Sequence, residues 1–261
     1  MNTVLMYHAI PEDARDQAGA DPHYSVLRGQ FAAHLKLIVD GGRRPASVRD
    51  ILDGQAAGED TGHWVGITFD DGHRSNYTAA AMLRDVGGSA DFFVNPSTVG
   101  TGNFCSWAQL REMADWGMSI QSHGQNHRFL DDLSPDEVRL ELARSKEVIE
   151  QELGRPVTLF APPGGRQAPD MGALAQRLGY QRICSSRVGL WGDGGDGPHE
   201  VPRLAVLMGT GLPQLRRWVE QSPIEMGWQR GRYTLLRKAK QMLGNGAYVK
   251  LRGALLRSAA R

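Results

Sequence analysis

The chain has 261 residues, of which 41% are apolar and 23% are charged, and its formal net charge at neutral pH is +1. This composition is ordinary for a soluble globular protein and allows one large domain, or one domain with a tail. A net charge this small gives no case for nucleic acid as a partner, and none is expected. The only cysteines, Cys105 and Cys184, are too few for a disulfide framework and are expected to be reduced and partly buried thiols.

The N-terminal segment has neither a basic region nor a long apolar run, so it does not read as a signal peptide. No stretch of the chain approaches the roughly 18 apolar residues that are needed to span a bilayer. The expectation from these two observations is a cytoplasmic protein.

Strand-like and helix-like patterns alternate along the chain, which is typical of a β/α architecture. Ser134, Pro135 and Glu137 form the clearest helix start, with an N-cap, a proline at the first position and a capping-box glutamate. The expected strands are 3–7, 64–69, 90–94, 118–122, 157–160, 181–185 and 203–207, and the expected helices are 28–40, 76–86, 107–116, 135–153 and 169–178.

Two polar motifs stand directly after predicted strands. Thr68–Gly72 places two adjacent carboxylates at the end of one strand, and His123 with His127 follows another. Asp-Asp-Gly alone is a common turn, and a lone pair of histidines four apart often shares a solvated face. In α/β barrels, however, the chemistry gathers at the carboxyl ends of strands. Two imidazoles and one carboxylate would there make a three-ligand catalytic metal site with one open position, and the second carboxylate would remain as a general base.

With these motifs the chain resembles the polysaccharide deacetylase family, also called the NodB-homology or carbohydrate esterase 4 family. Thr68–Gly72 matches the first family motif, His123–His127 the second and Phe160–Gly165, more loosely, the third. The resemblance covers roughly residues 3 to 222. It implies an α/β fold of the NodB-homology type, a distorted (β/α)7 barrel over residues 1–222. The pattern of basic and apolar residues predicts that a basic amphipathic helical tail follows over residues 223–261.

The resemblance also implies a role for each site residue. Asp71, His123 and His127 would bind one divalent metal ion, and Asp70 would be the general base. Zinc is favoured by these ligand types, although nickel, cobalt or iron would accept them too. The backbone N–H of Gly164, at a position where the family usually has an aromatic residue, would stabilise the oxyanion. Arg203 resembles the arginine that holds the base aspartate in some family members.

Two departures from the family pattern concern the catalytic groups. Gly124 replaces the Ser or Thr that follows the first metal histidine. The Leu-x-His motif that supplies the general acid is not visible, and Val206–Gly209 stands near that region without a histidine. His8, at the end of the first predicted strand, is a candidate for the acid, and a protonated Asp70 or bulk water is the alternative.

The C-terminal segment is basic throughout. Residues 226–261 contain no acidic residue and nine Lys or Arg, interspersed with apolar residues. This pattern suits amphipathic helices that lie on an anionic membrane surface. A helical lid on the barrel, or a contact between subunits, is the alternative interpretation.

Taken together, the residues and the resemblance predict a metal-dependent hydrolase. Its reaction would be removal of N-acetyl, or O-acetyl, groups from an amino sugar in a polysaccharide or glycolipid precursor, with the sugar linked to a nucleotide or a lipid. One alternative is an amidohydrolase that acts on a small linear or cyclic amide. Another is a carbohydrate-binding pseudoenzyme that keeps the metal, against which the presence of the base Asp70 argues.

Overall fold

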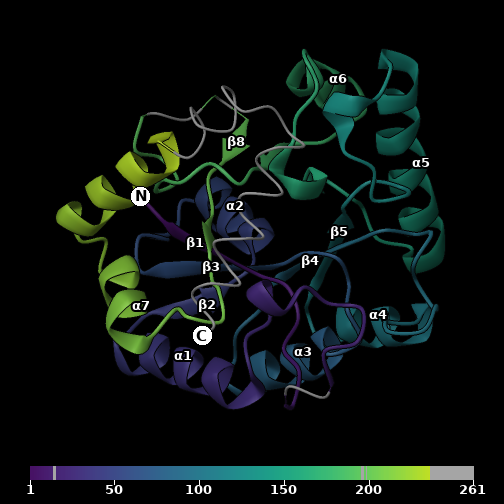
Figure 1. Ribbon diagram of the computed structural model, residues 1–261. Helices are drawn as coiled ribbons and strands as arrows, with labels where there is room; N and C mark the ends of the chain where they lie inside the picture. Colours follow the sequence, from purple (N-terminus) through teal and green to yellow (C-terminus); the bar gives the residue numbers. More distant parts are fainter. Residues whose placement is uncertain (14–15, 195–196, 198, 236–261) are drawn as a thin grey trace.

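Parallel strands and helices alternate in the computed structural model, which describes residues 1–13, 16–194, 197 and 199–235 (Figure 1). The strands of the described part are β1 Thr3–Tyr7, β2 Arg44–Ala46, β3 Trp64–Phe69, β4 Asp91–Val94, β5 Ser119–Ser122, β6 Leu159–Phe160, β7 Arg182–Cys184, β8 Glu200–Val201 and β9 Leu204–Ala205. The α-helices are α1 Arg28–Asp40, α2 Val48–Ala56, α3 Asn76–Asp85, α4 Trp107–Asp115, α5 Pro135–Leu153, α6 Met171–Arg177 and α7 Leu212–Val219, and residues 223–235 are also helical.

All strand pairs are parallel, and the strands follow the order β8-β7-β6-β5-β4-β3-β1-β9, with β2 paired to β3 off this path. The first and last strands of this order, β8 and β9, are separated in the sequence only by Pro202 and Arg203. Three Cα–Cα steps span at most roughly 11 Å. The sheet must therefore curl until its two edges approach each other, and Arg203 lies at the seam.

The two faces of the curled sheet have different neighbours. Leu5 and Tyr7 of β1 point outward into the large core, over which α1, α3, α4 and α5 lie (Figure 1). Val4 of the same strand points inward, where it shares a small apolar cluster with Phe93 and Cys184. This alternation follows from the two-residue period of a strand. The inner face is thus narrow and largely filled, which leaves the carboxyl ends of the strands as the place for a site.

The fold class predicted from the sequence, a distorted (β/α) barrel, is confirmed. The strands predicted at 3–7 and 64–69 and the helices predicted at 28–40 and 135–153 have the predicted bounds. Two strands, β2 and β8, and two helices, α2 and α7, were not predicted, because strands of two or three residues carry no readable alternation. The strand predicted at 157–160 is shorter, since the Gln121 side-chain oxygen accepts hydrogen bonds from the N–H groups of Thr158 and Leu159.

Local signals explain where the long helix α5 begins and ends. Ser134 and Glu137 form a complete capping box, and Gly154 ends the helix in the left-handed region with φ 62°. Glycine adopts this conformation without steric cost. The helix thereby presents a fixed buried stripe to the sheet, which includes Glu141 among apolar residues.

Residues 11–22 form a loop, with no strand or α-helix among those of them that the structure describes. The ring of His73 contacts the carbonyl of Ala18 through Nε2 at 3.1 Å, and the Tyr24 ring lies over His8 with centroids 4.5 Å apart. The loop is therefore held at the carboxyl end of the barrel.

The C-terminal tail is only partly described. Most of the predicted basic segment, residues 236–261, lies outside the described residues, and the domain boundary at 222 stays a prediction. Among the helices that the structure describes, none is both long and apolar enough to cross a membrane.

Candidate metal centre

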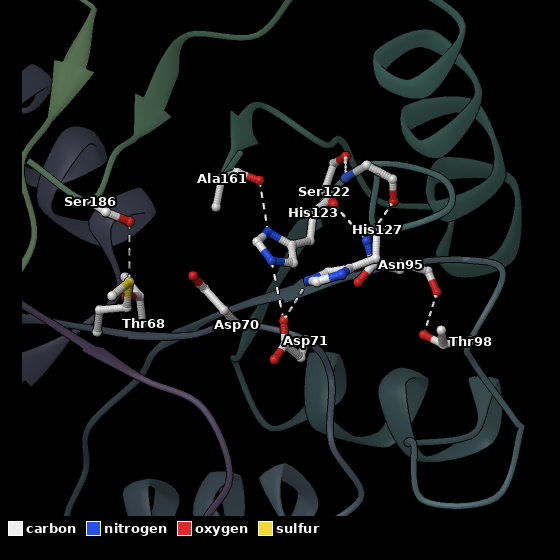
Figure 2. Close-up of polar contacts among 12 residues, drawn as sticks. Thr68, Asp70, Asp71, Asn95, Thr98, Ser122, His123, His127, Ala161 and Ser186 are labelled. Atoms are coloured by element: carbon white, nitrogen blue, oxygen red, sulfur yellow. Dashed lines mark hydrogen bonds and ion pairs between the residues drawn. The ribbon is translucent and has the colours of Figure 1, made fainter. Parts of the chain in front are cut away.

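The structure brings together the three predicted ligands from two strand ends (Figure 2). Asp71 Oδ1 lies 3.3 Å from Nε2 of His123 and 3.1 Å from Nε2 of His127. One ligand atom from each of the three residues falls within 4.8 Å of the others. His123 is buried, whereas Asp71 and His127 are part-exposed. The cluster is consequently walled by protein on one side and open to solvent on the other.

An unusual backbone conformation separates the two adjacent carboxylates. Asp71 has φ 73°, and Gly72 follows with φ 72°. A left-handed conformation at a residue other than glycine is uncommon and costs free energy, so it persists where the surroundings impose it. The chain here leaves β3 abruptly, and Figure 2 shows Asp70 and Asp71 pointing in different directions. One strand end can thereby supply a metal ligand and a separate base.

The carbonyl of Ala161 fixes the ring of His123. His123 Nδ1 lies 2.7 Å from this oxygen, which follows β6. A carbonyl only accepts hydrogen bonds, so Nδ1 carries a proton and Nε2 is the atom that faces Asp71 and can ligate a metal. A metal-ligating histidine is commonly oriented in this way by its second nitrogen.

The loop that carries His127 is held by two residues that the sequence analysis missed. Asn95 donates through Nδ2 to the carbonyls of His123 and Gly124, at 2.5 and 3.0 Å. Glu141, which is buried, accepts from the backbone N–H and the side-chain amide of Asn126, at 2.8 and 2.7 Å. A Cβ on Gly124 would lie 3.2 Å from Glu141 Oε2, so the glycine lets this carboxylate approach.

A sequence signal for Glu141 existed. The residue falls within the stripe of α5 that also buries Val138, Leu142, Ser145 and Ile149. An acidic residue on the core face of a predicted helix is rarely buried without a partner. Its partner is the metal loop, where it supports the segment in which Gly124 replaces the family's Ser or Thr.

The donor set fits a divalent transition metal. Bonds of about 2.0–2.1 Å at tetrahedral angles place neighbouring ligand atoms about 3.3 Å apart, close to the two Asp71–His distances. Burial raises the pKa of Asp71, but hydrogen bonds from the two imidazoles outweigh it and hold that pKa well below its usual range. The hydrogen bond that His127 donates to Asp71 raises the pKa of His127 in turn. The carboxylate is thus kept charged, as a metal ligand must be.

Asp70, beside the ligands, forms a buried bidentate ion pair with Arg203. The two guanidinium nitrogens Nη1 and Nη2 donate to Oδ1 at 2.6 Å and to Oδ2 at 2.9 Å. The side-chain exposures are 0% for Arg203 and 5% for Asp70. Arg203 also donates to the Ser185 carbonyl and to Thr68 Oγ1, at 3.1 and 3.2 Å. Arg203 thus contacts Asp70 directly, and its part in catalysis stays a prediction.

The ion pair decides the charge of Asp70. Burial raises the pKa of this carboxyl group, but the charge and hydrogen bonds of Arg203 outweigh burial, so the pKa lies below its ordinary value. An ionised carboxylate next to a metal site can accept a proton from water.

His8 follows β1 and lies close enough to the site to interact electrostatically with Asp71 and Asp70. Its Nδ1 atom is buried and has no hydrogen-bond partner among the described residues. Burial lowers the pKa of His8, and the two carboxylates only partly oppose this effect. A lowered pKa favours the neutral imidazole, and the role of His8 as the general acid stays a prediction.

Gly164 lies in the short 3-10 turn Pro163–Gly165, next to the residue that fixes His123. It is exposed and has φ 61°. Within the described part of the chain its backbone N–H donates to no acceptor. This donor is free to meet a negative oxygen that develops in the site.

Comparisons with known proteins agree with the geometry. The family model described as polysaccharide deacetylase matches residues 57–183. YxkH of Bacillus subtilis, a polysaccharide deacetylase by name, is 29% identical over 191 residues, which are 71% of this chain and 64% of that protein. The peptidoglycan-N-acetylglucosamine deacetylase of Bacillus cereus is 29% identical over 124 residues, which are 47% of this chain and 56% of that protein. The chain thus spans less than two thirds of either relative.

Among solved structures, the Streptococcus pyogenes deacetylase PplD in complex with acetate superimposes with a TM-score of 0.72 and 24% identity. The match covers 84% of this chain and 96% of that one. This likeness establishes the shared barrel fold.

Proposed function

Because residues 57–183 place the chain in the polysaccharide deacetylase family, we propose that it is a metal-dependent hydrolase that removes N-acetyl, or O-acetyl, groups from an amino sugar in a polysaccharide or glycolipid precursor. One observation carries the proposal: the three-ligand cluster of Asp71, His123 and His127 adjoins a separate carboxylate, Asp70, that Arg203 keeps ionised. A protein that only bound sugar would have no use for this base.

The roles of the residues follow from their positions. When bound, a divalent ion, most simply zinc, supplies Lewis-acid chemistry by acidifying water and polarising the acyl carbonyl. Asp70 accepts the proton of the attacking water, and Arg203 orients Asp70 through both oxygens. The Gly164 N–H donates to the oxyanion as the carbonyl carbon becomes tetrahedral. His123 and His127, fixed by Ala161, Asn95 and Glu141, keep their geometry throughout.

The leaving amine must gain a proton as its bond to the acyl carbon breaks. Protonated Asp70 can return the proton that it took from water, which balances the reaction without a second acid. His8 is the other candidate, although burial lowers its pKa and so disfavours the protonated form that an acid needs. We expect His8→Asn to retain most of kcat and Asp70→Asn to abolish it; loss of activity in both variants would assign the acid to His8.

The first test of the proposal is metal content. Elemental mass spectrometry of the wild type and His123→Ala should find about one equivalent of a transition metal in the wild type and a large loss in the variant. Acetate release from a panel of N-acetylated sugars should then depend on that metal. A wild type that binds no metal after reconstitution, or that releases acetate from no sugar, would count against the hydrolase.

A small linear or cyclic amide is the alternative substrate for the same groups. Including such amides in the panel separates the two cases, because the chemistry of the acyl group is shared and only the amine differs.

We further propose that the protein contacts the anionic, cytoplasmic face of a membrane through residues 226–261. The described part of this region supports the idea. Trp228 and Leu235 are 59% and 70% exposed, and their spacing of seven residues puts them on one helix face. Ile224, just before this region, is 87% exposed and extends the same face by four residues. The Arg232 guanidinium lies 5.7 Å from the Trp228 ring centroid.

Charge is divided sharply between the two parts of the chain. The segment 226–261 carries nine of the 30 basic residues and none of the 29 acidic ones, which leaves the rest of the chain at a net charge of −8. An anionic surface would attract the tail and repel the barrel. The protein should co-sediment with vesicles that contain phosphatidylserine, less so in high salt, and not with neutral vesicles; equal binding to both would contradict the proposal.

A further inference from the structure

Phe129 is a part-exposed aromatic residue in the loop that carries the metal ligands. It follows His127 by two residues and is 42% exposed. Its ring edge packs against Gly164, so that a Cβ added at that glycine would lie only 2.8 Å from Phe129 Cε1. The ring therefore occupies space that any side chain at position 164 would enter.

Arg166 holds this ring from one face. Its guanidinium carbon lies 4.4 Å from the centroid of the Phe129 ring. Asp131 and Asp132 hold Arg166 in turn, with Nε–Oδ2 and Nη2–Oδ1 distances of 2.8 and 2.7 Å. Only 12% of the Arg166 side chain is exposed. The orientation of the ring is thus fixed before any ligand arrives, while a large part of its surface stays in contact with water.

The position of the ring relates it to both halves of the candidate site. Along the chain, Phe129 is two residues from the ligand His127. In space it contacts Gly164, whose free N–H suggests a role in stabilising the oxyanion. A molecule whose acyl group reaches the metal cluster and Gly164 can therefore extend over the ring that contacts both loops. Phe129 is the large apolar side chain that joins them.

We propose that Phe129 is the stacking platform for a sugar ring of the substrate. This inference rests on the proposed function and adds to it a residue that determines specificity. A pyranose ring has an apolar face of C–H groups, which packs against an aromatic ring, while its hydroxyl groups remain hydrated. A preorganised platform of this kind loses little side-chain entropy when the ligand binds. Aromatic walls with few polar groups are typical of small-molecule sites.

A purely structural role for Phe129 would have different effects on the kinetic constants. A ring that served only to support the loop would affect His127 and hence metal binding and kcat. A ring that contacts the sugar affects the Michaelis constant, because it binds ground state and transition state alike. The split between KM and kcat therefore distinguishes the two roles.

The experiment compares Phe129→Ala, Phe129→Tyr and the wild type as full-length, metal-loaded proteins. Acetate release from the N-acetylated sugar that the panel identifies gives kcat and KM. We expect Phe129→Ala to raise KM about three- to tenfold, as an aromatic contact of this size allows, with kcat and metal content unchanged. Phe129→Tyr keeps the ring and should behave as the wild type. Leu140→Ala removes an exposed apolar side chain on α5, 52% exposed, and is the matched control, with no expected change.

Binding without turnover makes the test independent of catalysis. Saturation-transfer NMR with an N-acetylglucosamine tetramer, in the presence of EDTA, should show contact with the wild type and a clear loss of signal with Phe129→Ala. If the wild type binds this tetramer through Phe129 but releases no acetate from any sugar, the proposed hydrolase fails and the platform stands.

Three results would overturn the platform. One is an unchanged KM in an active Phe129→Ala enzyme. Another is a fall in kcat or metal content at constant KM, which would make the ring a support for the His127 loop. The last is the absence of any tetramer signal in the wild type.

Discussion

Replacing Arg203 by Met removes one partner of the buried pair with Asp70 and leaves a carboxylate without a counter-charge. The pair has two hydrogen bonds, at 2.6 and 2.9 Å, and at most 5% exposure on either side chain. Breaking a buried pair from one side costs about 3–5 kcal/mol, because the remaining charge stays buried. Methionine is unbranched and fills much of the vacated space, so the loss of charge dominates the effect.

A second substitution tests whether the stranded charge, and not lost packing, causes the destabilisation. Asp70→Asn in the Arg203→Met background removes the stranded charge, so the double variant should be more stable than Arg203→Met alone, although it carries one more change. The coupling energy should reach about 2 kcal/mol. Urea unfolding at pH 7, with EDTA present so that metal binding does not contribute, measures Arg203→Met, Asp70→Asn and the double variant against the wild type. Arg111→Met, which breaks an exposed pair with Glu152 at 3.1 Å, is the control and should cost less than about 1 kcal/mol.

Two outcomes would refute the interpretation. A loss below about 1 kcal/mol in Arg203→Met would show that Asp70 does not depend on the pair. A double variant less stable than the single one would show that packing, and not the stranded charge, carries the cost. In an active enzyme, Arg203→Lys should also move the acidic limb of the pH–rate profile to higher pH, because weakening the pair raises the pKa of Asp70.

Three further predictions concern the support of the barrel and the site. Burial raises the pKa of Asp91 to about 7 from 3.8; the folded state then keeps a proton that the unfolded state releases, so stability falls as pH rises from about 4 to 7. Asp91→Asn should reduce this fall in the free energy of unfolding by roughly 3–4 kcal/mol. Urea unfolding between pH 4.5 and 8 measures it, and an equal pH dependence in wild type and variant would contradict the prediction. Glu141→Ala should weaken metal affinity about 10- to 100-fold in competition titrations, whereas Glu147→Ala, an exposed change on the same helix, should leave it unchanged; equal affinities would remove Glu141 from the support of the loop. A Cβ at Gly66 would lie 2.9 Å from Val4 Cγ2 inside the barrel. Gly66→Ala should therefore lower the stability measured by thermal unfolding by about 1–3 kcal/mol, and Val4→Ala in the same chain should restore part of this loss. A Gly66→Ala variant as stable as the wild type would disprove the overlap.

Much of the fold was readable from the sequence because the signals are local. The apolar run at 64–69 and the capping box at Ser134 depend on residues within one or two turns of chain, and the corresponding elements have the predicted bounds. The short strands β2 and β8 were not readable, because two or three residues show no period. They form since neighbouring strands offer them hydrogen bonds, as β3 does for β2.

The sequence by itself determined the candidate ligands, since two motifs after two strands limit the choice to a few side chains. Only the tertiary structure decided what holds them. Arg203 meets Asp70 across 133 positions of chain because the sheet closes at its seam, and Glu141 reaches Asn126 because α5 packs that face inward. Phe129 contacts Gly164 because the loop after His127 packs against the turn after β6. Contacts between residues far apart in sequence depend on how the elements pack, and no local pattern encodes that packing.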